Sequence, residues 1–245
     1  MIGSTIVHLD IVDSTNNYAA KELLTKSLND GTVFIAACQN SGKGQGGSSW
    51  ESAADRNLTF SIVLYPPNLD VARQFSISKA IALGITDFLA VYIGNLSIKW
   101  PNDIYAGDQK IAGILIETAV TTGKLSRAIV GIGLNVNQER FVSDAPNPIS
   151  LRNLTGNNYD LSALLGELCS KLDLRYLQLF EGKSELVGND YESQLFRRGQ
   201  WAKYFADGIY FEGMITGTDA DGRLLILNRE GLIRSFQFKE VQFSP

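Results

Sequence analysis

The first hundred residues predict strands that alternate with helices. Residues 5–12 alternate apolar and polar positions and are rich in β-branched side chains, which favours a strand, and the capping residues that follow predict a helix directly after it. Residues 32–38 and 58–65 are short apolar runs typical of buried strands. Residues 71–92 repeat apolar positions with a helical period, so we expect a long helix that packs against the sheet.

The rest of the chain predicts more strands, two helices and then a β-rich part. Three runs of strand length lie at residues 96–100, 110–118 and 125–134. Turn residues separate these runs, so the sheet should be partly antiparallel. Two amphipathic helices are expected at residues 161–180 and 185–196. Short strands with hairpin-turn sequences then follow, and we predict an α+β fold with a mixed, helix-flanked sheet in residues 1–198 and a small β-barrel in residues 199–245.

The composition is that of a folded globular protein. Hydrophobic residues make up 44% and charged residues 20%, and the net charge of −4 leaves no basic surplus to neutralise a phosphate backbone. The two cysteines lie too far apart for a metal cluster or a disulfide framework. With no signal-peptide pattern and no apolar run near the roughly 20 residues of a membrane span, we expect a cytoplasmic protein that binds neither membranes nor nucleic acid. The single histidine, His8, should be structural.

A glycine-rich segment is the first candidate for ligand binding. From Ser41 to Trp50 it reads SGKGQGGSSW, and its four glycines let successive backbone N–H groups point into one concavity, which suits an anion such as a phosphate. The spacing around Lys43 does not fit a Walker A loop, and the segment runs towards a strand and not into a helix as a Rossmann turn does. Taken alone, the pattern also fits a flexible surface loop.

Other segments place polar and small residues at strand ends. In KWPND, residues 99–103, the proline stops the strand, so that Asn102 and Asp103 are displayed where polar groups can converge on a ligand. KIAGIL, residues 110–115, opens the next strand with a lysine and small residues, as expected where a ligand approaches the backbone. GIGLNVN, residues 131–137, joins strand glycines to asparagines that offer donors and acceptors. Composition alone favours solvated lysines at 99 and 110 and a turn aspartate at 103, and the small residues Ala112 and Gly113 count against that interpretation.

These segments, in this order, resemble the catalytic domain of biotin protein ligases. The resemblance runs from Asp13 to about Asn137, with further similarity in the carboxy-terminal part. Its most specific mark is the KWPND pentapeptide with the lysine at position 110, and the STN tripeptide at residues 14–16 supports it. The resemblance implies a sheet like that of class II aminoacyl-tRNA synthetases and biotin synthetases, followed by an SH3-like β-barrel.

The resemblance also implies a reaction and the residues that perform it. ATP, with Mg²⁺, would activate biotin to biotinyl-5'-AMP, and biotin would then pass to a lysine of a biotin carboxyl carrier protein or domain. Catalytic roles are implied for Lys110, the fixed cation beside the biotin carboxyl group and the α-phosphate, and for Asp103 and Lys99. The implied biotin contacts are Ser14, Thr15, Asn16, Gln39, Gly42, Lys43, Lys110 and Gly113. The implied ATP and adenylate contacts are Lys43, Gly44, Gln45, Trp50, Asn102, Lys110 and Asn135.

One departure from the family pattern concerns the glycine-rich loop. The family commonly carries arginines at the positions of Lys43, Gln45, Gly46 and Ser48, whereas only Lys43 is cationic here. Lysine offers a point charge and not a bidentate fork, so we expect a weaker phosphate clamp and more escape of biotinyl-adenylate than from a Gly46→Arg variant. The glycine density also predicts that residues 42–49 move until a ligand binds.

Two alternative functions and two further expectations complete the sequence-based view. A lipoate or octanoate ligase shares the fold and the carrier-lysine chemistry, but the KWPND segment favours biotin. A non-catalytic biotin-binding paralogue is a second alternative, against which the retained Lys110 argues. Because the chain begins close to its first catalytic strand, we expect the ligase-only form without an amino-terminal DNA-binding domain. A homodimer is compatible with the sequence.

Overall fold

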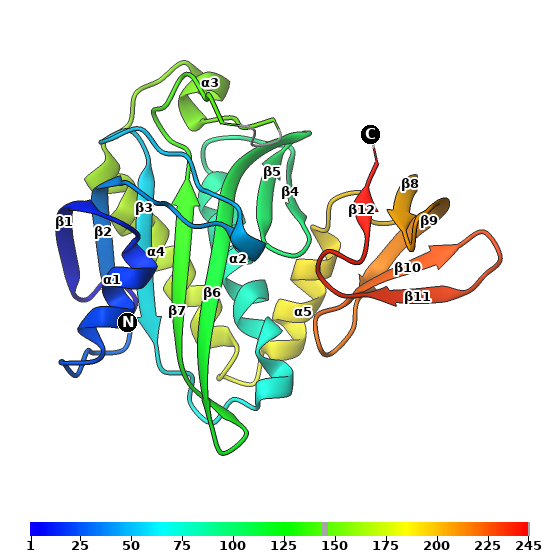
Figure 1. The fold of residues 1–245 in the computed structure, drawn as a ribbon, viewed down its shortest axis with the longest axis horizontal. Coiled ribbons are helices and arrows are strands. Elements are labelled where there is room, and N and C mark those ends of the chain that lie inside the picture. The colour runs from blue at the N-terminus through cyan, green and yellow to red at the C-terminus, as the bar shows by residue number, and fades with distance from the viewer. Residues whose placement is uncertain (144–146, 245) are drawn as a thin grey trace.

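The computed structural model describes residues 1–143 and 147–244, and its larger part is built on a seven-stranded mixed sheet with the strand order β1-β2-β3-β7-β6-β5-β4 (Figure 1). The strands are β1 (Ile6–Val12), β2 (Thr32–Gln39), β3 (Leu58–Leu64), β4 (Leu96–Lys99), β5 (Asp103–Ala106), β6 (Gln109–Thr121) and β7 (Lys124–Leu134). β1 and β2 pair in parallel, and the other neighbours pair antiparallel. The prediction of a mixed sheet is confirmed.

Helices cover both faces of this sheet, with α1 on one side and α2, α4 and α5 on the other (Figure 1). The helices are α1 (Thr15–Glu22), α2 (Phe75–Leu89), α3 (Leu151–Thr155), α4 (Leu161–Gln178) and α5 (Ser184–Ser193), with short 3₁₀ turns η1 (Gln45–Gly47) and η2 (Val71–Arg73). Every residue of β3 is buried because the strand is covered on both faces. Gly84 lets α2 approach α4 closely, since a Cβ there would lie 2.9 Å from the Cα of Leu172.

A five-stranded antiparallel sheet with the order β11-β10-β9-β8-β12 forms the carboxy-terminal part. Its strands are β8 (Trp201–Ala206), β9 (Ile209–Thr218), β10 (Leu224–Asn228), β11 (Ile233–Phe236) and β12 (Gln242–Phe243). The buried indole N–H of Trp100 donates a 2.8 Å hydrogen bond to the carbonyl of Gly222 and so ties this part to the end of β4. The predicted fold class, a helix-flanked mixed sheet followed by a small β-structure, is confirmed.

Some short elements differ from the sequence prediction. Only turn residues were expected between the strands predicted at residues 96–100 and 110–118, but β5 lies there, begins at the last residue of KWPND and pairs with β4 and β6. The asparagine-rich loop after β7 contains α3, which a capping box between Ser150 and Asn153 begins. Both elements are too short for hydrophobic periodicity to reveal them. Within the described residues, no helix is both long and apolar enough to cross a membrane.

Candidate active site

The floor of the site lies where β3, β7 and β6 run side by side. Ser61, Gly131 and Leu115 lie opposite one another across the three strands. In the next row, Gly133 and Gly113 face each other. A Cβ on Gly131 would lie 2.5 Å from Oδ1 of the Asn16 side chain, and one on Gly133 would lie 2.2 Å from the ring of Trp50. The close approach expected at these strand glycines is therefore present, because only glycine leaves room for both side chains.

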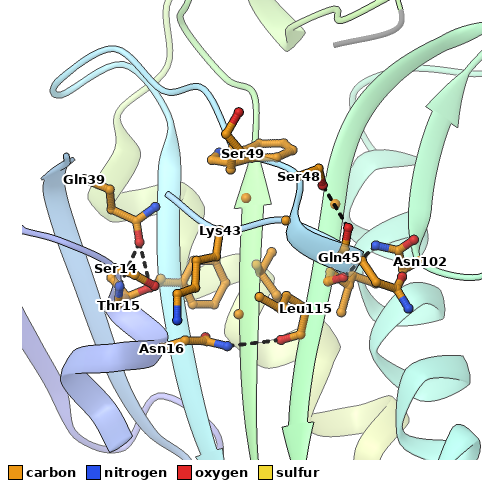
Figure 2. A pocket seen from close by; sticks show the side chains of 18 of the residues that line it. Ser14, Thr15, Asn16, Gln39, Lys43, Gln45, Ser48, Ser49, Asn102 and Leu115 are labelled. Carbon is orange, nitrogen blue, oxygen red and sulfur yellow. Dashed lines mark hydrogen bonds between the residues drawn. The ribbon is translucent and has the colours of Figure 1, made fainter. Parts of the chain in front are cut away.

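Above this floor is a pocket formed by α1, the end of β2, the glycine-rich loop, β6 and β7 (Figure 2). The implied site residues that line it are Ser14, Thr15, Asn16, Gln39, Lys43, Gly44, Gln45, Trp50, Asn102, Lys110 and Gly113. Segments that are far apart in the sequence thus converge on one cavity. The implied residues Gly42, Lys99, Asp103 and Asn135 do not belong to its lining.

One side of the pocket is a chain of neutral polar groups. The carbonyl oxygen of the Gln39 side chain accepts hydrogen bonds from the backbone N–H of Thr15 at 2.8 Å and from its hydroxyl at 3.1 Å (Figure 2). The hydroxyl of Ser61 lies 2.7 Å from Oγ1 of Thr15 and 2.6 Å from Oδ1 of Asn16. The amide nitrogen of Asn16 donates to Glu117 at 2.7 Å. Because Thr15, Asn16 and Ser61 are buried, their orientations are fixed by these partners.

Two cationic side chains, Lys43 and Lys110, line the pocket, and Lys110 is held in an ion pair. Its Nζ lies 2.7 Å from Oδ1 of Asp103, and each of the two side chains is about one-fifth exposed. Burial raises the pKa of the Asp103 carboxyl above its ordinary value, and the neighbouring Lys110 charge opposes that rise. Lys110 also lies 5.6 Å from the centre of the Trp50 ring. One face of the ammonium group therefore contacts a carboxylate while the side chain still lines the cavity.

Trp50 packs across the glycine row of the floor, over Gly133 and Gly113. The buried indole nitrogen of Trp50 has no hydrogen-bond partner among the described residues. An unpaired buried N–H costs free energy, so a ligand acceptor at this point would be favoured. Trp50 was expected to contact ATP or the adenylate, and the structure places its side chain in the pocket lining.

The glycine-rich loop is folded as a tight turn over the pocket. The backbone N–H of Gly44 donates to the carbonyl of Ser48 at 2.7 Å, and Nζ of Lys43 donates to the side chain of Asn17 at 2.5 Å. From the carboxy-terminal part, Nζ of Lys239 donates to the carbonyl of Gly46 at 2.8 Å. The single cation of the loop is thus directed at α1, and a second cation, outside the loop, holds its tip.

Three of the implied site residues besides Asp103 lie outside the pocket lining, namely Lys99, Asn135 and Gly42. Nζ of Lys99 lies 3.0 Å from the hydroxyl of Tyr105 and between 4.7 and 5.9 Å from the centres of the Tyr105, Phe196 and Phe243 rings. Burial lowers the pKa of Lys99.

The other two residues support the backbone around the pocket. The amide nitrogen of the buried Asn135 side chain donates to the carbonyl of Ile149 at 3.0 Å, which fixes the segment after β7. A Cβ on Gly42 would lie 2.5 Å from the carbonyl oxygen of Trp50, because the two ends of the loop are paired there. Both positions therefore shape the site from behind its lining.

Comparison with known proteins places this architecture in a family. The family model for biotin/lipoate A/B protein ligases matches residues 9–135, just over half of the chain. The chain belongs to the biotin/lipoate A/B protein ligase family. The bifunctional ligase/repressor BirA of Salmonella typhimurium is 30% identical over 242 residues, which span 95% of this chain and 72% of that protein.

Other members of the biotin/lipoate A/B protein ligase family resemble the whole chain. The biotin–[acetyl-CoA-carboxylase] ligase of Mycobacterium tuberculosis is 29% identical over 233 residues, or 91% of this chain and 85% of that protein. The structure of a biotin protein ligase from Aquifex aeolicus in complex with biotin and ATP superposes with a TM-score of 0.81 and 26% identity, and covers 98% of this chain and 100% of that one. These relatives and structural neighbours are biotin protein ligases.

In this family member, Ser61 and Glu117 support the pocket from behind its lining, through hydrogen bonds to Thr15 and Asn16, although neither was among the residues implied by sequence. Ser61 left a weak signal, since it is a polar residue inside a strand that is otherwise apolar apart from Thr59. Glu117 lies at an exposed position of β6, where a charged residue is common and therefore indicates no function. Only the register that places β3, β7 and β6 side by side brings both residues to α1.

Proposed function

We propose that the chain is a biotin protein ligase. A carboxylate oxygen of biotin attacks the α-phosphorus of ATP, the bond to the β-phosphate breaks, and pyrophosphate leaves. The amine of a lysine on a biotin carboxyl carrier domain then attacks the acyl carbon of biotinyl-5'-AMP, AMP leaves with the bonding electrons, and the amine loses a proton. The observation that carries the proposal is a single pocket that joins neutral polar groups to the cation Lys110.

The neutral polar groups and the cation have different roles in the proposed reaction. Thr15 and Gln39 offer hydrogen bonds without charge, which suits a neutral ureido ring. Lys110 stands where negative charge gathers on the carboxylate and the α-phosphate, and a fixed cation there stabilises the transition state. Asp103 holds the Lys110 ammonium group in place and is the carboxylate that we assign to orient an incoming amine. Trp50 covers the floor and limits the access of water.

Magnesium bound to the ATP phosphates is part of the proposal, as expected for a nucleotide substrate. In residues 1–143 and 147–244, no group of three or more His, Cys, Asp or Glu side chains could hold a metal ion, so we assign the metal no protein ligand and no step. The carrier as acceptor and a cytoplasmic location also belong to the proposal. The assignment of individual residues to biotin or to ATP follows the resemblance and the pocket lining together.

The first half-reaction can be tested without the carrier by ATP–pyrophosphate exchange. We expect exchange that depends on biotin and magnesium and that lipoate does not support. Exchange with lipoate alone would indicate the lipoate or octanoate ligase. Biotin binding by the folded protein without any exchange would indicate the non-catalytic paralogue. Transfer of labelled biotin to an isolated carrier domain tests the second half-reaction.

The loop gives this ligase a testable difference in adenylate retention. Gly46 has a φ of 66°, and a Cβ there would lie 2.6 Å from Cε of Lys239, so a Gly46→Arg variant would disturb the loop as well as add charge. Ser48 is exposed and has an extended backbone with a φ of −72°, so Ser48→Arg is the cleaner change. We expect biotinyl-adenylate to leave the Ser48→Arg variant more slowly than the unmodified protein, measured by rapid dilution. Equal release rates would contradict the idea of a weak phosphate clamp.

A further inference from the structure

The polar chain beside the pocket ends on a carboxylate. It runs from Gln39 through Thr15, Ser61 and Asn16 to Glu117. Glu117 is the only charged group among these five residues, and it lies on β6 at an exposed position, two residues beyond the pocket residue Leu115. A carboxylate can only accept hydrogen bonds, so Glu117 decides which group donates and which accepts in the hydrogen bonds that lead from it back to Thr15.

The direction is set first at Asn16. Its amide nitrogen must face Glu117, 2.7 Å away, and the carbonyl of Leu115, 3.4 Å away, since both are acceptors. The amide oxygen of Asn16 must then face the hydroxyl of Ser61, at 2.6 Å. An amide oxygen cannot donate, so the single proton of Ser61 is directed to Asn16.

The consequence reaches the pocket at Thr15. Ser61 donates its only proton to Asn16, so it has none left to donate to the Thr15 oxygen, although the two oxygens are 2.7 Å apart. The Thr15 proton is directed to Ser61 or to the carbonyl oxygen of Gln39, both within the protein. Thr15 therefore presents lone pairs to the pocket. The amide oxygen of Gln39 is occupied by Thr15, which leaves its NH₂ group as the free donor.

We propose that Glu117 is a positioning residue that sets this side of the pocket to offer an acceptor at Thr15 and a donor at Gln39. This inference rests on the proposed function: a ureido ring has two N–H donors and one carbonyl acceptor, so it matches such a pair. Without Glu117 the Asn16 amide can turn over and donate to Ser61. The Ser61 proton then turns to Thr15 and occupies one of the lone pairs that the ligand needs. The Leu115 carbonyl opposes the turn, so the effect is partial.

The test compares Glu117→Leu, Glu117→Gln and the control Thr121→Leu in biotin-dependent ATP–pyrophosphate exchange. Thr121 is exposed at the end of the same strand and has no part in the polar chain, so it controls for an added surface leucine. We expect Glu117→Leu to raise the KM for biotin roughly tenfold, as for loss of a hydrogen bond to a charged group. Its kcat and its KM for ATP should stay within about twofold, because ground-state and transition-state binding of biotin are weakened alike. Glu117→Gln should recover most of the affinity, since its amide oxygen can accept from Asn16.

A second readout addresses the acceptor at Thr15 directly. Biotin methylated on a ureido nitrogen lacks a donor, so the unmodified protein should prefer biotin over this analogue more strongly than Glu117→Leu does. An unchanged biotin KM in Glu117→Leu, with normal exchange by the unmodified protein, would overturn the inference alone. Equal changes in KM for biotin and ATP with a lower melting temperature would also overturn it, as a structural role only. Absence of biotin-dependent exchange in the unmodified protein would overturn the proposed function and this inference together.

Discussion

The ion pair of Lys110 and Asp103 allows the structural and chemical roles of one lysine to be separated. The two charged atoms are 2.7 Å apart and both side chains are about one-fifth exposed. At an effective dielectric constant near 20 their attraction is about 6 kcal/mol. Most of this is offset by the cost of removing both charges from water. In Lys110→Met the Asp103 carboxylate loses its partner, and we expect the free energy of unfolding to fall by about 2 kcal/mol at neutral pH.

The loss of stability should depend on pH, because burial raises the pKa of Asp103 in the folded protein. In the unfolded chain the pKa of this carboxyl is about 4. Because its pKa is higher in the folded chain, the free energy of unfolding falls as pH rises through the range between the unfolded and the folded pKa. Once it is protonated, at lower pH, the penalty disappears. Urea unfolding of Lys110→Met should therefore approach that of the unmodified protein as pH falls from 7 towards 4. In Asp103→Asn/Lys110→Met neither charge of this pair remains, so most of the lost stability should return and its dependence on pH should disappear.

Activity should not return with stability. In the proposed mechanism Lys110→Met removes the cation beside the reacting carboxylate and phosphate, so exchange should fall roughly 100- to 1,000-fold. The double variant should be as slow as the single variant although most of the lost stability has returned. Recovery of exchange in the double variant would refute the reasoning, because Lys110 would then act only by neutralising Asp103.

Three other changes have defined outcomes. Gly133→Ala places a Cβ 2.2 Å from the Trp50 ring, so the indole should leave the floor, with red-shifted tryptophan emission and exchange slowed about tenfold; unchanged emission would contradict the packing. Lys239→Met removes the 2.8 Å hydrogen bond to Gly46, and biotinyl-adenylate should leave a few times faster by rapid dilution, with little change in melting temperature. Arg175 pairs with aspartates of α2 and α5, so Arg175→Met should lower the free energy of unfolding by about 1–2 kcal/mol in urea while the KM for biotin stays the same.

Much of the candidate site could be predicted from the sequence because its parts are local signals. The glycines at 131 and 133 and the small residues after Lys110 indicate where another group approaches the backbone closely, which can be predicted from a few neighbouring positions. These segments do line one pocket. Ser61 and Glu117 could not be found in this way, since an isolated serine and an exposed glutamate carry no local requirement.

The order of the main strands and helices, the mixed sheet and the segments that line the pocket followed from the sequence by itself, because hydrophobic periodicity, turn residues and local motifs act over short distances. The tertiary structure decided which side chains meet. The register of β3, β7 and β6 joins Ser61 and Glu117 through Asn16, and aromatic packing holds Lys99 outside the pocket lining. The physical reason is that such contacts depend on pairing between distant segments, and the type of a residue does not indicate which residue lies beside it on a neighbouring strand.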